Sequence, residues 1–181
     1  SIDTDGDGFV DNLCIIFSGN SELSAKRGIL WPQRKDLALP EEKAIYMAGK
    51  KLASYIMVFD GANGFNSQFD GITLNTGVLC HEMSHSLGTY DLYHVSGALN
   101  PVGVWDLMSD NQITPQGMTA YTKMRYCKWI DQIPEIKEAG TYTLNPLSST
   151  TTDKIAYKIK PIGSDEYFVV EYRKKEGCDA N

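Results

Sequence analysis

The chain has few of the features that mark nucleic-acid or membrane proteins. Among its 181 residues, 17 lysines and arginines stand against 23 aspartates and glutamates, which gives a net charge of −6. No basic stripe is present, so the sequence predicts no nucleic-acid partner. The longest apolar runs, such as Tyr55–Phe59, are far shorter than the ~20 residues that a helix needs to cross a bilayer, so no membrane span is predicted. With 42% hydrophobic residues, the chain can still bury a core.

Cysteine and histidine are also scarce. The four cysteines include no C-x-x-C pair, and their even number permits disulfides without deciding the cellular compartment. The chain begins at Ser1 without an initiator methionine or a signal peptide, so we expect a processed form or a fragment. The three histidines all lie between His81 and His94. Any histidine-based metal chemistry is therefore confined to one short segment.

That segment carries a zinc-binding pattern. Residues 81–91 read H-E-M-S-H-S-L-G-T-Y-D, which has the form H-E-x-x-H-x-x-G-x-x-D. Positions four apart lie nearly above one another on a helix, so His81 and His85 can direct both imidazoles at one zinc ion. Glu82 lies one residue further round the helix, where it can reach a water bound to that ion. It is the usual general base in this motif.

The third zinc ligand is expected a few residues later. Gly88 tolerates the left-handed conformation that ends helices, and the residues after it can bring Asp91 back under the ion. Two histidines and one aspartate leave the fourth position open for water, as a catalytic zinc requires. His94 is also chemically competent and stays the alternative, although the H-x-x-G-x-x spacing favours Asp91.

A second metal-binding pattern opens the chain. Residues 3–11 read D-T-D-G-D-G-F-V-D, with Gly8 at the sharp turn of a calcium loop. The expected calcium ligands are four aspartate side chains and one backbone carbonyl: Asp3, Asp5, Asp7, Asp11 and the carbonyl of Phe9. Cys14 replaces the bidentate glutamate of an EF-hand and an apolar strand follows, so we predict a structural calcium loop. The alternative is a solvated acidic turn, but the aspartates would repel one another without a cation.

The remaining pattern predicts an α+β fold. Helices are expected at about Asn75–Leu87 and at Gly117–Lys128. Strands are expected at Leu13–Phe17, Ile45–Met47, Leu52–Val58, Thr141–Leu144, Ile155–Ile159 and Tyr167–Tyr172, the second and third as a hairpin, and irregular structure at Gly19–Leu39, Asp60–Gly71 and Tyr93–Gln112. We therefore predict a catalytic domain at residues 1–131. A C-terminal three-strand β region at residues 132–181 is expected to be incomplete and to pack on that domain.

These motifs together resemble the immune inhibitor A family of secreted bacterial metallopeptidases. The similar segments follow one another along most of the chain: D-T-D-G-D-G-F-V-D-N with its apolar strand and Ser18-Gly19, Leu30-Trp31-Pro32, H-E-M-S-H-S-L-G-T-Y-D-L-Y, Gly103–Ser109, the helix ending at Lys128-Trp129, and the strand Glu166–Arg173. The chain departs from the family at Ser84, at Thr89-Tyr90 and at Gln33. These departures bear on substrate preference and leave every proposed ligand in place.

The resemblance implies a zincin-like catalytic domain, in which a mixed sheet packs on helices and zinc lies in a cleft. It implies a bacterial protein that is secreted, at the cell surface or periplasmic, and often made as an inactive precursor. It also implies that Met108 lies in a turn beneath the zinc, although by residue type Met108 suits ordinary core equally well. The function expected is a zinc endopeptidase that cleaves proteins or peptides with Glu82 as general base.

Two other functions stay open. A binding or adhesion module could keep the fold without turnover, but the intact Glu82 argues against it. An aminopeptidase-like zincin would take its third ligand from a later glutamate, but Asp91 is already available six residues after His85. Supporting roles have candidates too. Tyr90, Tyr93 and Tyr121 could donate to the developing oxyanion, and Asp106 could fix a histidine tautomer.

Overall fold

The computed structural model describes residues 1–18, 31–60, 76–94, 100–151 and 153–180. Helices and three small sheets are present together, which confirms the mixed α and β class. The chain divides into two compact units, Ser1–Ser86 and Leu87–Asn181. The boundary predicted between residues 131 and 132 lies inside the second unit and stays a prediction. Within the described residues, no helix has the length and apolar character to cross a bilayer.

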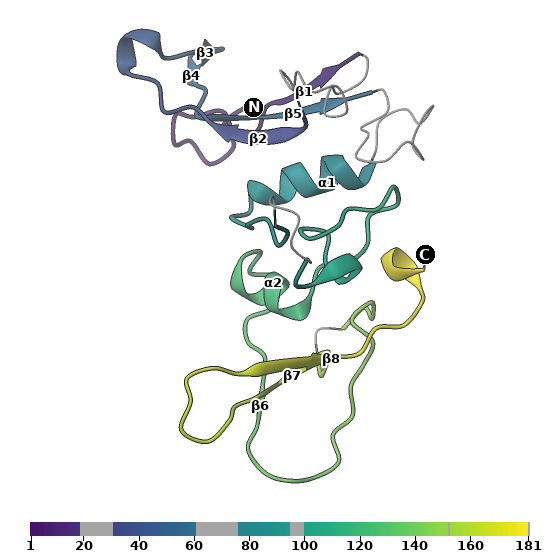
Figure 1. Cartoon of the computed structure of the whole chain (residues 1–181). Helices are drawn as coiled ribbons and strands as arrows, with labels where there is room; N and C mark the ends of the chain where they lie inside the picture. The colour runs from purple at the N-terminus through teal and green to yellow at the C-terminus, as the bar shows by residue number, and fades with distance from the viewer. Residues whose placement is uncertain (19–30, 61–75, 95–99, 152, 181) are drawn as a thin grey trace. The chain divides into compact units, whose positions relative to one another are not determined.

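The first unit is built on a three-stranded sheet with the strand order β1-β5-β2. β5 (Ser54–Phe59) lies in the middle, parallel to β1 (Cys14–Phe17) and antiparallel to β2 (Gln33–Asp36), as Figure 1 shows. The sequence of β5 is apolar without alternation, which is typical of a strand covered on both faces. Its last four residues are all buried. The strand predicted at Leu13–Phe17 is confirmed as β1.

The prediction that Gly19–Leu39 is irregular is wrong where β2 forms. Residues 19–30 of that stretch lie outside the described residues. The sequence of β2 is Q-R-K-D, which contains no apolar residue and so gives no hydrophobic period. β2 forms because its backbone pairs with the edge of β5 that β1 does not use. Charged residues on an outer strand also discourage pairing with other chains.

The hairpin exists but is shorter than predicted. β3 (Tyr46–Met47) pairs antiparallel with β4 (Lys50–Lys51). Ala48 and Gly49 form the connection with φ of 46° and 78°, and two positive φ values in a two-residue loop match the twist of a hairpin. The stretch predicted as its second strand, Leu52–Val58, instead contributes to the separate strand β5. A short 3-10 helix, η2, precedes the hairpin at Glu41–Lys43.

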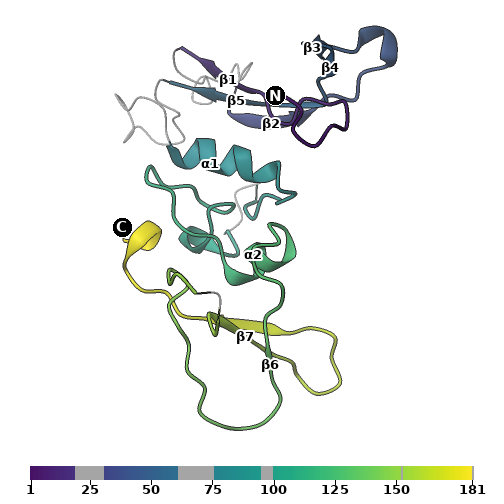
Figure 2. The same cartoon turned by 180° about the vertical axis from the view of Figure 1, so that it is seen from behind.

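Helix α1 (Thr76–His85) covers one face of the β1-β5-β2 sheet (Figures 1 and 2). Val78 of the helix packs against Ile56 and Val58 of β5, and this cluster is the core of the first unit. The helix predicted over Asn75–Leu87 therefore exists and ends two residues early. Its expected first residue, Asn75, lies outside the described residues, as does the loop predicted after Asp60. The sheet face thus fixes the helix that carries the H-E-x-x-H pattern.

The second unit contains helix α2 and a three-stranded sheet. α2 is capped by the hydroxyl of Thr119, which accepts a hydrogen bond from the Thr122 amide at 3.2 Å. The elements are α2 (Ala120–Arg125), the strands β6 (Glu135–Ile136), β7 (Ala156–Ile159) and β8 (Phe168–Glu171) in the order β6-β7-β8, and the 3-10 helices η4 (Gly103–Trp105) and η5 (Gly177–Asp179). The core between α2 and the sheet consists of Ala120, Ile130, Ile133, Leu147, Ile155 and Ala156.

The predicted elements of this unit need two corrections. α2 is shorter than the helix expected over Gly117–Lys128. The strand expected at Thr141–Leu144 does not form, and β6 (Glu135–Ile136) takes the edge of β7 instead. A β-forming sequence such as T-Y-T-L becomes a strand only where it can pair with the edge of another strand. The edge of β7 that it would need is already paired with β6. β7 and β8 are shorter versions of the other two predicted strands.

Candidate metal centre

The C-terminal half of α1 presents the two motif histidines together. The rings of His81 and His85 lie 5.0 Å apart between centroids and perpendicular to one another. His81 and Glu82 are buried and His85 is half-buried. Ser84 is buried as well, and its hydroxyl donates to the carbonyl of Cys80 at 2.7 Å, so the helix itself satisfies this polar side chain. The helical spacing thus brings two imidazoles to one place.

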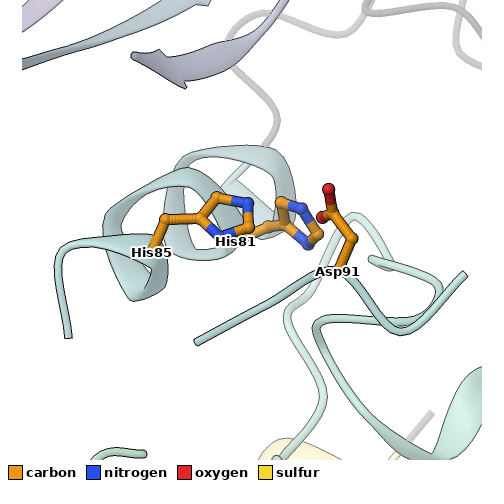
Figure 3. A group of neighbouring side chains, drawn as sticks. All are labelled: His81, His85 and Asp91. Atoms are coloured by element: carbon orange, nitrogen blue, oxygen red, sulfur yellow. The ribbon is translucent and has the colours of Figure 1, made fainter. Parts of the chain in front are cut away.

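Asp91 joins the histidines after a reversal of the chain. Gly88 has φ of 87°, a left-handed conformation that favours glycine and ends the helical path. The ligand atoms of His81, His85 and Asp91 all lie within 4.8 Å of one another (Figure 3). A tetrahedral zinc ion with bonds of about 2.1 Å would separate its ligand atoms by about 3.4 Å. Small side-chain rotations would close the group on such an ion, and its donor set of two nitrogens and one oxygen suits zinc.

His94, the alternative third ligand, is placed differently. Its side chain is exposed, and it is not in the group that contains Asp91. Its backbone amide donates to the Asn100 side chain at 3.4 Å. Of the two alternatives that the sequence leaves open, the geometry brings Asp91 to the histidines.

The N-terminal loop gathers a second acidic group. Carboxylate oxygens of Asp3, Asp5 and Asp11 lie within 4.8 Å of one another, and Asp7 lies outside this group. Asp3 is buried and accepts from the amides of Gly6 and Gly8, at 2.8 and 3.2 Å. Asp7 instead accepts from the amide of Phe9 at 2.8 Å. The loop therefore holds three of the four predicted aspartates in one place.

A lysine from the hairpin reaches into this loop. Nζ of Lys50 lies 2.6 Å from Oδ2 of Asp3. The ammonium group of Lys50, assisted by the Gly6 and Gly8 amides, lowers the pKa of Asp3 against the opposing effect of burial. Asp3 in turn raises the pKa of Lys50. This lysine was missed in the sequence analysis because it lies far along the chain in a polar hairpin.

The sequence model described as immune inhibitor A peptidase M6, catalytic domain, matches residues 3–125. The chain belongs to this family. The match begins at Asp3 of the N-terminal loop and runs through α2, so it includes α1 and Asp91. Among curated proteins, nothing matches the chain. The M6 family is a family of metallopeptidases, so the chain carries a metallopeptidase domain whose substrates are proteins or peptides.

Asp106 of this M6 peptidase connects two segments of the second unit. Its fully buried carboxylate accepts from the Met108 amide, the Thr119 amide and the Thr122 hydroxyl, each at 2.8 Å. These three bonds engage both carboxylate oxygens, and none of the donors is a histidine. Asp106 therefore holds Met108 to the start of α2, and the suggestion that it fixes a histidine tautomer stays a prediction.

Met108 itself is fully buried. Its carbonyl accepts a hydrogen bond from the amide of Leu92, the residue after Asp91, at 2.8 Å. The M6 peptidase thus ties the backbone beside Asp91 to the segment that carries Met108. Sequence reasoning named both segments but gave no signal for this contact.

Two of the three tyrosines suggested as oxyanion donors, Tyr90 and Tyr121, lie in an aromatic row. Tyr90 is 69% exposed and meets Tyr126 edge to face, with the ring centroids 5.6 Å apart. Tyr121 continues the row between Tyr126 and Tyr167, at 6.2 and 6.4 Å. Burial raises the pKa of Tyr126, and Tyr121 adds to this. Tyr90 is the member of the row that directly precedes Asp91 in the chain.

Proposed function

We propose that this chain is the catalytic domain of a secreted bacterial zinc endopeptidase with a zincin-like fold. The observation that supports it best is the group formed by His81, His85 and Asp91, with Glu82 next to the first histidine on the same helix. Membership of a family of secreted bacterial peptidases supports the location. Two imidazoles and one carboxylate leave one position open on zinc, which is the arrangement of a catalytic and not a structural site.

The proposed chemistry divides between the ion and the chain. When bound, zinc would act as a Lewis acid, lowering the pKa of a coordinated water and polarising the scissile carbonyl. His81 and His85 would hold the ion through imidazole nitrogens, and Asp91 would hold it through a carboxylate oxygen. A carboxylate oxygen of Glu82 takes the proton of the attacking water and passes it to the nitrogen of the leaving amine. The phenol of Tyr90 is the proposed donor to the oxygen on which negative charge develops.

The adhesion-module alternative is not favoured, because the chain keeps both the ligand group and the glutamate that hydrolysis needs. The aminopeptidase-like alternative needs a glutamate as third ligand. Within the described parts of the chain, the group around the two histidines contains Asp91 and no second carboxylate. The placement of these three residues therefore favours an endopeptidase with Asp91 as the third zinc ligand.

We also propose that the N-terminal loop binds calcium through Asp3, Asp5 and Asp11, with Asp7 and the Phe9 carbonyl completing the oxygen ligands. The Lys50 ammonium now shares Asp3, so the ion must displace it. The role is structural, because the loop connects to β1 and pairs with the hairpin through the bridge between Phe9 and Lys51. Calcium and the Lys50 ammonium then compete for the Asp3 carboxylate.

The main proposal is tested with the purified chain and its Glu82→Gln variant. Zinc bound per chain is measured by elemental analysis, and cleavage of a denatured protein is followed by mass spectrometry of the fragments. We expect both proteins to bind zinc, cleavage at internal peptide bonds, and a rate lower by about 10²–10⁴-fold in the variant. Zinc binding without Glu82-dependent cleavage would support the adhesion module. Single amino acids released from the substrate's N-terminus would support the aminopeptidase.

A further inference from the structure

The segment Trp105–Met108 is held from one side by a buried carboxylate. Asp106 binds the Met108 amide within its own segment, and the Thr119 amide and Thr122 hydroxyl at the start of α2. Hydrogen bonds to a charged acceptor are stronger than neutral ones, and a buried carboxylate has a large cost if its donors are lost. Asp106 therefore joins the segment firmly to α2.

A largely buried guanidinium holds the same segment from the C-terminal sheet. Nη2 of Arg173 donates to the carbonyl of Trp105 at 2.6 Å, and Nη1 donates to the carbonyl of Gly117 at 3.2 Å. Two carboxylates fix the guanidinium: Glu171 accepts from Nε at 2.9 Å and Asp179 accepts from Nη1 at 3.0 Å. Asp106 joins its own segment to the start of α2, and Arg173 binds a backbone carbonyl in or next to each of these two parts.

The two carboxylates that hold Arg173 also bind backbone. Glu171 accepts from the amide of Ala120 at 2.7 Å, and Asp179 accepts from the amide of Gly117 at 2.9 Å. The end of β8 and the residues after it are therefore attached by charged groups to Ala120, the first residue of α2, and to Gly117 shortly before it. All three residues, Glu171, Arg173 and Asp179, lie beyond residue 125, where the family match ends.

The held segment in turn fixes the backbone beside Asp91. The Leu92 amide donates to the Met108 carbonyl at 2.8 Å. Asp91 itself is exposed, so packing contributes little to the position of its side chain. The course of its backbone is therefore one determinant of where the carboxylate lies, and the bond at Leu92 ties the next backbone amide to a buried segment.

We propose that Asp106 and Arg173 are positioning residues for the metal ligand Asp91, acting through the Met108 carbonyl and the Leu92 amide. This inference rests on the proposed function for the role of Asp91 as a ligand. Neither residue touches the metal. The C-terminal sheet, although outside the family match, then belongs to the support of the metal site.

The test uses Asp106→Asn and Arg173→Met in the whole chain, each with a matched control. Asp110→Asn makes the same change on an exposed residue of the same loop, and Lys174→Met removes an exposed ion pair next to Arg173. Three quantities are measured: amide hydrogen exchange at Leu92 in the metal-free chain, zinc affinity by competition with a chelating dye, and Tm. We expect both test variants to speed exchange at Leu92 and to weaken zinc binding by about 10–100-fold, while the controls resemble the parent chain.

The outcomes separate the two proposals. Lower Tm with unchanged Leu92 exchange and unchanged zinc affinity, measured where the variants are folded, would overturn positioning and leave a purely structural role. If the parent chain binds no zinc, the proposed function fails, and Leu92 exchange alone decides whether the two residues hold this backbone. If a test variant does not fold, Thr122→Val and Arg173→Lys replace the pair. Parent-like exchange at Leu92 in those milder variants would equally overturn the inference.

Discussion

Nζ of Lys50 lies 2.6 Å from Oδ2 of Asp3. A lysine ammonium therefore forms an ion pair with one of the aspartates that are proposed to bind calcium. The Asp3 side chain is buried, whereas the Lys50 side chain is 40% exposed and can move into solvent. An ammonium group and Ca²⁺ both neutralise the same oxygens. How the loop responds to calcium therefore depends on Lys50.

Replacing Lys50 with methionine is expected to make the chain more dependent on calcium. Without calcium, Lys50→Met should melt at a lower temperature than the parent chain, because Asp3 loses its cationic partner. With calcium, the variant should gain more in Tm than the parent, since the ion no longer competes with an ammonium group. Thermal melting with a chelator and with excess calcium measures both effects.

Lys51→Met is the matched control for that experiment. Lys51 is the next residue in the hairpin but pairs with Glu41 instead of the loop. Its replacement should leave the calcium increment in Tm unchanged. Equal increases in Tm with calcium in all three proteins would show that Lys50 does not compete with calcium. No increase in any of them would contradict calcium binding and favour a solvated acidic turn.

The same ion pair predicts how stability varies with pH in the absence of calcium. The pKa of Asp3 is lowered below its ordinary 3.8 by Lys50, so its contribution is present above that value and is lost as the pH falls through the lower, folded-state pKa. The pKa of Lys50 is raised above 10.5, so its contribution is present below that value and is lost as the pH rises through the higher one. The pair stabilises the fold between these limits.

Unfolding by denaturant across the acid range measures this contribution. The parent chain should lose more free energy of unfolding than Asp3→Asn as the pH falls below 3.8, because the parent must also protonate the ion-paired Asp3 carboxylate. Parallel curves for the two proteins would mean that the pair adds nothing to stability.

The choice of third zinc ligand is tested by comparing Asp91→Ala with His94→Ala. The group of neighbouring ligand atoms contains Asp91 and not His94. Asp91→Ala is therefore expected to weaken zinc binding strongly, whereas His94→Ala should bind zinc as the parent does. Competition with a chelating dye measures both affinities. The reverse order of the two affinities would make His94 the ligand.

The parts of the site that sequence alone predicts are those set by local spacing. His81 and His85 come together because a helix repeats about every 3.6 residues, and Gly88 supplies the reversal that brings Asp91 back. The strand at Leu13–Phe17 and the helix in Gly117–Lys128 follow from short apolar patterns in the same way. In each case the residues that decide the structure are close neighbours along the chain.

The parts that were missed depend on residues far apart along the chain. Asp106 binds Thr119 and Thr122, which lie 13 and 16 residues away, and Arg173 binds the carbonyl of Trp105 across 68 residues. Strand β2 is polar and exists because β5 offers it an edge. Hydrophobic periodicity carries no information on such partners, because tertiary packing decides which charged side chain meets which backbone group.

Zinc K-edge X-ray absorption on the purified, zinc-loaded chain tests the central claim most directly. The account predicts one zinc ion with two imidazole nitrogens at about 2.0–2.1 Å and carboxylate and water oxygens completing four ligands. It also predicts that the imidazole signal falls to one ring in His85→Ala. A chain that takes up no zinc, or a spectrum dominated by sulfur from the cysteines, would contradict it.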